Sequence, residues 1–143
     1  MLAYPIEVSR HDGQFVVEWP DIPECVTVGD TREEALANAP TALETVLAAL
    51  IDHRRPIPRA SQALGRPIVT PGPLAAMKVE LYIAMREQGM KQADLARRLG
   101  WPAPQVARLL DLMHHSRVDQ VEAAMKVLGR RFLVSTVTAD RAA

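Results

Sequence analysis

The spacing of apolar residues changes along this 143-residue chain, and that change limits the folds it can adopt more than any other feature. In the first 30 residues apolar side chains alternate with polar ones, which is the period of a half-buried strand. After residue 73 they recur every three or four positions, which is the period of a helix. Between 56 and 73 the sequence holds five prolines and two glycines and shows no regular period. We therefore expect an α+β protein with a sheet-bearing first module and an all-α second module.

The first module is predicted to begin with a β-hairpin. Its strands, Leu2–Arg10 and Gln14–Trp19, flank Asp12 and Gly13, a dipeptide that favours the positive φ angles of a two-residue hairpin turn. The prolines that follow Trp19 predict a rigid bend, and Cys25–Val28 is typical of a third short strand.

A helix is predicted to follow these strands. Thr31 and Glu34 form the pattern of a capping box, and apolar residues then recur at helical spacing as far as Leu50. Pro40 lies inside this helix and should kink it, because proline removes one backbone hydrogen bond. Beyond the helix we expect an extended connector in which Arg66–Thr70 forms a short edge strand.

The second module contains a pair of short helices around a tight turn, within residues 92–110. Gly100 lies at the turn, where a positive φ is expected. These constraints are those of a helix-turn-helix, and the spacing resembles that of phage-repressor-like (Xre-type) regulators, whose second helix enters the major groove. An ordinary αα-hairpin in a helical bundle is the alternative. The inward apolar positions are Leu95, Leu99, Val106 and Leu109.

Eight residues of this segment and of the loop after it are candidates for contact with DNA. Gln105 and Arg108 are placed to reach base edges, whereas the remaining polar residues are better suited to phosphates. Ala103 and Pro104 can make only apolar contacts, such as one with a thymine methyl group. For each arginine a solvated surface charge is the alternative. The set is Gln92, Arg97, Ala103, Pro104, Gln105, Arg108, His115 and Arg117.

Formal charge divides between the two modules. The chain carries 17 basic and 17 acidic residues, but residues 1–73 hold 6 basic and 10 acidic ones, a balance of −4. Residues 74–143 hold 11 basic and 7 acidic ones, a balance of +4. A basic module suits nucleic acid, and an acidic module suits a basic partner.

The C-terminal segment Arg131–Val137 returns to a period of two and predicts a strand. A lone strand leaves its backbone groups unpaired, so this strand needs a partner from elsewhere. Because helix-turn-helix proteins bind two half-sites as dimers, we expect the strand to pair with its symmetry mate. The predicted dimer contacts are Phe132, Leu133, Val134 and Val137.

Several strings, taken in order, resemble those of HicB antitoxins. The N-terminal domain of that family is matched by Tyr4-Pro5, Gly13–Val17, Trp19–Cys25 and Gly29–Leu36, and the close of that domain by Ile57–Ser61. The second half resembles the helix-turn-helix version of HicB, including Leu112–Ser116 and Ala123–Gly129. The resemblance covers nearly everything from Tyr4 to Val137. It departs from the family pattern at Pro40 and at Pro102-Ala103-Pro104.

The resemblance implies a fold and a role. Residues 1–61 would form a partial RNase H-like domain, an antiparallel sheet plus one helix, that binds and inactivates HicA, a small basic toxin that cleaves mRNA. Residues 62–73 would be a linker, 74–137 an Xre-like helix-turn-helix domain with a C-terminal strand for DNA binding and dimerisation, and 138–143 a tail. The chain would be a cytoplasmic antitoxin that also represses its own operon at operator DNA, as a homodimer or a tetramer.

The toxin contact is expected at the rigid bend that follows the hairpin. Asp21 and Glu24 would meet the cationic surface of the toxin, and Trp19 and Ile22 would give apolar support. A bend that only connects two strands, with solvated carboxylates, is the alternative.

We expect neither catalysis nor a metal or cofactor. An active RNase H-like site needs several converging carboxylates, whereas Glu7 and Glu18 lie on the solvent side of their strands. Cys25 lacks a histidine partner and is expected to fill the core. No apolar run could span a bilayer, and the N-terminus is unlike a signal peptide. Two other functions stay open: a stand-alone helix-turn-helix regulator with an N-terminal sensing or interaction domain, and a degenerate nuclease with residual metal binding.

Overall fold

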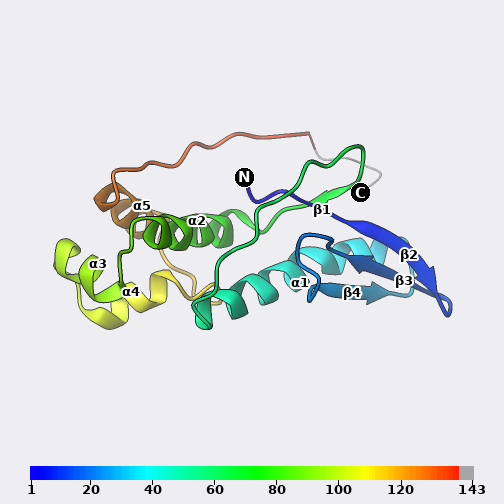
Figure 1. Cartoon of the computed structure of the whole chain (residues 1–143), viewed down its shortest axis with the longest axis horizontal. Coiled ribbons are helices and arrows are strands. Elements are labelled where there is room, and N and C mark those ends of the chain that lie inside the picture. The colour runs from blue at the N-terminus through cyan, green and yellow to red at the C-terminus, as the bar shows by residue number, and fades with distance from the viewer. Residues whose placement is uncertain (139–143) are drawn as a thin grey trace. The chain divides into compact units, whose positions relative to one another are not determined.

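The computed structural model describes residues 1–138, which group into two compact units. The first unit holds 1–47, 58–72 and 136–138, and the second holds 48–57 and 73–135. Within the described residues the chain is a mixed α and β protein with small antiparallel sheets and five helices (Figure 1). All of these strands lie in the first unit, as the change of apolar period predicts.

The main sheet is antiparallel, and its strands β2 (Glu7–His11), β3 (Gln14–Glu18) and β4 (Val26–Gly29) lie in that order. The hairpin prediction is confirmed, because β2 pairs with β3 around a two-residue turn. Both turn residues have positive φ angles, 51° at Asp12 and 79° at Gly13.

A second, two-stranded sheet joins β1 (Tyr4–Pro5) to β5 (Ile68–Val69). The long first strand of the prediction is therefore divided at Ile6, whose backbone N–H donates to the Pro67 carbonyl at 2.9 Å. The expected edge strand in the connector is confirmed at β5. Part of the predicted linker 62–73 thus belongs to the first unit rather than lying free between two modules.

Helix α1 (Arg32–Asp52) begins at the predicted position and continues through Pro40. Thr31 Oγ1 accepts a hydrogen bond from the Glu34 N–H at 3.1 Å, and the Glu34 carboxylate accepts one from the Asp30 N–H at 3.0 Å. The helix start packs tightly on the end of β4, because a Cβ atom added at Gly29 would clash with the backbone nitrogen of Ala35. The buried face of this part of α1 consists of Ala35, Ala39, Leu43 and Leu47.

The second unit takes in the last residues of α1 and four further helices with their loops: α2 (Pro73–Glu87), α3 (Gln92–Leu99), α4 (Ala103–Leu109) and α5 (Val118–Val127). Helix α2 packs against α5, and α3 packs against both α4 and α5. Their shared core is apolar and includes Val79, Leu81, Leu95, Leu109 and Val121. None of the helices in residues 1–138 combines the length and apolar character that a membrane span requires.

The predicted C-terminal strand is absent from the single chain. Residues 130–138 form neither helix nor strand, and Leu133, Val134 and Val137 are 87%, 91% and 90% exposed, whereas Phe132 is half-buried. A strand needs a neighbour for its backbone groups, and the described residues of one chain supply none to this segment. Pairing with a second copy stays a prediction. Residues 139–143 of the predicted tail lie outside the described residues.

Candidate functional site

Helices α3 and α4 form the compact pair that the sequence predicts. The turn between them begins at Gly100, whose φ of 67° lies in the left-handed region that glycine adopts without strain. The next residue, Trp101, donates its N–H to the Ala96 carbonyl at 3.1 Å and closes the end of α3. Leu95, Val106 and Leu109 are fully buried, so three of the four predicted inward positions lie in the core, and Leu99 is half-buried.

A buried lysine fixes the end of α4 and the loop that follows it. Lys78 of α2 has no exposed surface, and its ammonium donates to the carbonyls of Arg108, Asp111 and His114 at 3.0, 2.7 and 2.5 Å. A helix leaves its last carbonyls unpaired and carries partial negative charge there. A cation at this position therefore supplies hydrogen-bond donors to the carbonyls and stabilises the negative end of the helix dipole. Burial lowers the pKa of Lys78 below its usual 10.5, and the Asp111 carboxylate opposes that shift.

Lys78 is not among the residues predicted from the sequence, although its spacing held a usable signal. The residue lies four positions after Leu74 and three before Leu81, inside the apolar face of its helix. A lysine there must either leave the core or find several acceptors. Ser116 adds a second contact to the same carbonyl, because its hydroxyl donates to Arg108 O at 3.3 Å. The N-cap residue of α5 is the next residue, Arg117.

The surface of α3 and α4 presents most of the predicted DNA-binding residues to solvent. Gln105 alone is half-buried. Two of the arginines have acidic neighbours: Arg97 pairs with Asp94 at 3.1 Å, and Arg117 pairs with Asp119 at 2.8 Å. Arg108 makes no ion pair within the described residues. The exposed members are Gln92, Arg97, Ala103, Pro104, Arg108, His115 and Arg117.

Asp94 shapes the start of α3. Its carboxylate accepts the Lys91 backbone N–H at 3.1 Å, which supplies a partner for a group at the helix N-terminus. That hydrogen bond, with a smaller contribution from Arg97, lowers the pKa of Asp94 below its usual 3.8. The Arg97 guanidinium is therefore held near the start of the helix, and any phosphate would compete with Asp94 for it.

The bend after the hairpin is built differently from its prediction. Trp19 and Ile22 are 1% and 0% exposed, so they belong to the core and are unavailable to a partner surface. Two successive turns bury them, with the Ile22 N–H donating to the Trp19 carbonyl and the Cys25 N–H donating to the Ile22 carbonyl. That these two residues support a toxin contact stays a prediction, and their burial leaves them only the packing beneath the bend as a means of support. Burial of these apolar side chains in the core is favoured because it removes apolar surface from water.

The two carboxylates of the bend have separate roles. Asp21 is half-buried and accepts hydrogen bonds from the backbone N–H and the hydroxyl of Ser61, at 2.9 and 3.0 Å, so it ties the bend to the segment after α1. Glu24 is exposed, and no ion pair among residues 1–138 involves it. Cys25 is buried as predicted, and burial, with the neighbouring Glu24 charge, raises its thiol pKa to about 11. Burial and the raised pKa both favour the protonated thiol, which suits a residue of the core.

Comparison with known proteins supplies the family. A family model described as HicB-like antitoxin of bacterial toxin–antitoxin system matches residues 3–80. An Antitoxin HicB from Pseudomonas fluorescens (strain Pf0-1) is 42% identical over 141 residues, covering 97% of each chain. Antitoxin HicB 2 from Photorhabdus laumondii is 36% identical over 90% of this chain and 92% of its own, and Antitoxin HicB from Escherichia coli (strain K12) is 34% identical over 90% and 95%. With its hairpin, capped helix and helical second unit matched over nearly their whole length, this chain belongs to the HicB-like antitoxin family.

Proposed function

We propose that this chain neutralises a HicA-type mRNA-cleaving toxin through its first unit and represses its own operon by binding operator DNA through its second. In this proposal the first unit has a partial RNase H-like fold and the second an Xre-like helix-turn-helix. Membership of an antitoxin family supports the first part. The exposed polar surface of α3 and α4, fixed from inside by Lys78, is the observation that carries the second.

The charge division supports two kinds of partner. An acidic surface can cover the cations that an RNA-cleaving toxin must present to phosphates, and so block substrate entry without catalysis by the antitoxin. Glu24 is the better candidate contact at the bend, because the Asp21 carboxylate already serves Ser61. The +4 balance of residues 74–143 suits the phosphates of DNA.

Toxin neutralisation is tested by mixing the full chain with the purified toxin encoded beside it and measuring cleavage of an RNA substrate. We expect cleavage to stop at equimolar antitoxin. The Glu24→Lys variant should bind more slowly, and the loss should grow smaller as salt is raised, because charge complementarity mainly speeds association. Full cleavage with excess folded protein would favour the alternative, a stand-alone transcriptional regulator.

Operator binding is tested with Arg108. If its side chain contacts a base, Arg108→Ala should cost about 1–3 kcal/mol on operator DNA and little on random DNA. Gln92→Ala should weaken both about equally, because a phosphate contact positions the protein without reading sequence. Equal losses on both DNAs for Arg108→Ala would make it a phosphate contact as well.

Dimerisation through the C-terminal segment completes the proposal. Three of its apolar side chains are almost fully exposed in the single chain. Exposed apolar side chains that are close together favour burial against another protein surface. Ending the chain at Gly129 should leave a monomer in sedimentation and weaken operator affinity. A truncated chain that remains a dimer would move the contact elsewhere in the second unit.

A further inference from the structure

The outer edge of β4 has backbone groups available for another strand, since β3 is its single neighbour in the main sheet among the described residues. The two-residue hairpin turn fixes the alternation of the hydrogen bonds, so Thr27 exchanges them with Val17. The backbone groups of Val26 and Val28 therefore point away from β3. The Asn38 side chain agrees with this direction, because its amide donates to the Val28 carbonyl at 3.2 Å. A carbonyl oxygen can accept a second hydrogen bond, so this contact leaves the edge usable.

A groove of about 390 Å³ lies beside this edge, within the first unit. Strand β4 forms one wall, and α1 forms the other from Asn38 to Val46. The α1 wall is uncharged, and Glu24 is the one charged residue among those that line the groove. Thr27 shares the inner face of the sheet with its partner Val17, so a strand added to β4 would direct the side chain opposite Thr27 into this groove.

The outer face of the sheet carries exposed valines at the same edge. Val17 is fully buried, so its neighbours Val16 and Glu18 lie on the opposite, outer face. Val28 lies opposite Val16 and Val26 lies opposite Glu18, and these two valines of β4 are 43% and 50% exposed. Proteins usually avoid exposed apolar side chains on an edge strand, because such an edge readily pairs with another chain. The two valines thus point to a partner strand.

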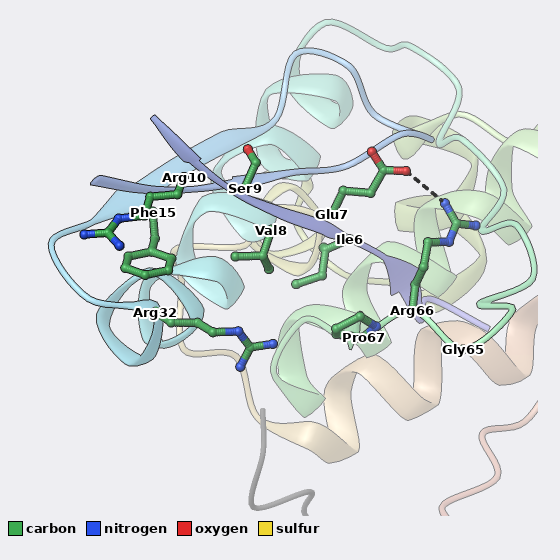
Figure 2. Close-up of a pocket in the computed structure, with 10 residues that line it drawn as sticks. All are labelled: Ile6, Glu7, Val8, Ser9, Arg10, Phe15, Arg32, Gly65, Arg66 and Pro67. Carbon is green, nitrogen blue, oxygen red and sulfur yellow. Dashed lines mark ion pairs between the residues drawn. The ribbon is translucent and has the colours of Figure 1, made fainter. Parts of the chain in front are cut away.

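A pair of carboxylates lies beside the valines on the outer face. Glu18 is directly opposite Glu7 of β2, and Figure 2 shows Glu7 and Ser9 on one side of that strand and Val8 on the other. Like charges at opposite positions destabilise a sheet. Glu7 has a loose ion pair with Arg66, at 3.7 Å, whereas no ion pair within residues 1–138 involves Glu18. A cation beside Glu18 would offset this repulsion.

The register decides where such a cation can come from. A residue of an added strand opposite Val26 would lie on the outer face, two strand spacings or roughly 10 Å from Glu18. A lysine or arginine there can lay its aliphatic stem over Val26 and reach the carboxylate. The residue opposite Val28 is two positions away and shares this face, where an apolar side chain would extend the valine row. The residue between these two faces the groove instead.

We propose that β4 binds an extended segment of a partner protein as a fourth strand, with a basic residue beside Val26 and an apolar residue two positions away, beside Val28. Main-chain hydrogen bonds supply affinity, and Glu18 selects the basic side chain. A second copy of β4 fits less well. Pairing Val26 with Val28 of another copy would bring Glu24 towards Asp30 of that copy, and both are exposed carboxylates. The proposal rests on neither toxin neutralisation nor operator binding.

The test uses the full chain labelled with ¹⁵N and a synthetic peptide that repeats valine, threonine, lysine and threonine. Its valines and lysines share one face when the peptide is extended. We expect the amide signals of Val26 and Val28 to shift and their hydrogen exchange to slow. A matched peptide with glutamate in place of lysine should cause neither change. Absence of any shift at β4 with the lysine peptide, or equal shifts with the glutamate peptide, would overturn the proposal.

Two kinds of variant separate the edge from the charge. Val26→Pro removes an outward N–H but no bond to β3, at the first residue of the strand, so the sheet should persist while peptide binding is lost. Glu18→Gln should weaken binding of the lysine peptide about threefold, whereas Glu122→Gln, at an exposed glutamate of α5, should leave it unchanged. If Val26→Pro does not fold, the two glutamate variants still decide the matter. Binding that survives Val26→Pro in a folded protein, or equal binding by the two glutamate variants, would refute the proposal.

A dilution series separates a partner segment from a second copy. The amide signals of Val26 and Val28 in the chain alone should keep their positions as the protein concentration is raised. If they move with concentration as they do with the lysine peptide, the edge is a contact between copies of this chain, and the proposed site for a basic partner segment is wrong.

Discussion

Each unit of this protein holds one of its loops with a single charged side chain, but the two side chains differ in burial. In the first unit Asp21 is half-buried and ties the bend after β3 to Ser61 with two hydrogen bonds. In the second unit Lys78 is fully buried and holds three carbonyls at the end of α4 and in the next loop. If Asp21 is removed, water can reach and hydrogen-bond to Ser61. If Lys78 is removed, water cannot readily reach the buried carbonyls that it served. The loop after α4 should therefore depend far more on one side chain than the bend does.

The strongest test of this comparison is Lys78→Met, which keeps the volume and removes the ammonium. Buried carbonyls of Arg108, Asp111 and His114 would lose their shared donor, so the free energy of unfolding should fall by about 3 kcal/mol. Urea unfolding of the full chain measures this loss. The control Lys126→Met, an exposed residue paired with Glu122, should cost less than about 1 kcal/mol. Similar losses in the two variants would mean that water reaches the carbonyls.

A smaller effect is expected at the bend of the first unit. Asp21→Ala removes both hydrogen bonds to Ser61 and should lower the free energy of unfolding by about 1.5 kcal/mol. Glu24→Ala, three residues along, should stay within about 0.5 kcal/mol of the wild type because that side chain is exposed. The same pair of variants, assayed for toxin inhibition, distinguishes a structural carboxylate from a contacting one. A larger loss of stability for Glu24→Ala would invert the roles assigned here.

The turn between α3 and α4 depends on backbone conformation instead of a side chain. Gly100→Ala meets no atom within 4 Å, but its φ of 67° is strained for alanine, so we expect a cost of about 1 kcal/mol. Thermal unfolding by circular dichroism detects a change of this size. Gly100→Asn should cost less, since asparagine tolerates the left-handed region better. If alanine and asparagine are equally harmless, the turn does not require this conformation.

The smallest effect is expected at Asp94, a half-buried residue at the start of α3 in the second unit. Its pKa is lowered in the folded chain, so its contribution to stability is fully present above the unfolded value of 3.8 and is lost as pH falls through the lower folded value. The stability difference between the wild type and Asp94→Asn should therefore shrink as the pH is lowered below 3.8. Thermal unfolding measured stepwise from about pH 7 to about pH 3 tests this. A difference that grows on acidification would contradict the assigned cause.

Local patterns were sufficient for much of the fold. The Asp12-Gly13 turn, the start of α1 at Thr31 and the left-handed Gly100 are each decided by a few neighbouring residues, and each was predicted. The division of the first strand was not predicted. It depends on β5, which lies more than sixty residues away in sequence and pairs with Tyr4 and Pro5.

The candidate site was harder to predict than the fold, because it too depends on contacts between segments that are distant in sequence. Sequence alone determined that the chain carries a sheet-bearing acidic half and a helical basic half, because period and charge are properties of neighbouring residues. Only the tertiary structure decided that Trp19 and Ile22 are core residues, that Asp21 serves Ser61, and that Lys78 is buried. Burial and hydrogen-bond partners depend on which distant segments meet, and an amphipathic pattern does not specify those meetings.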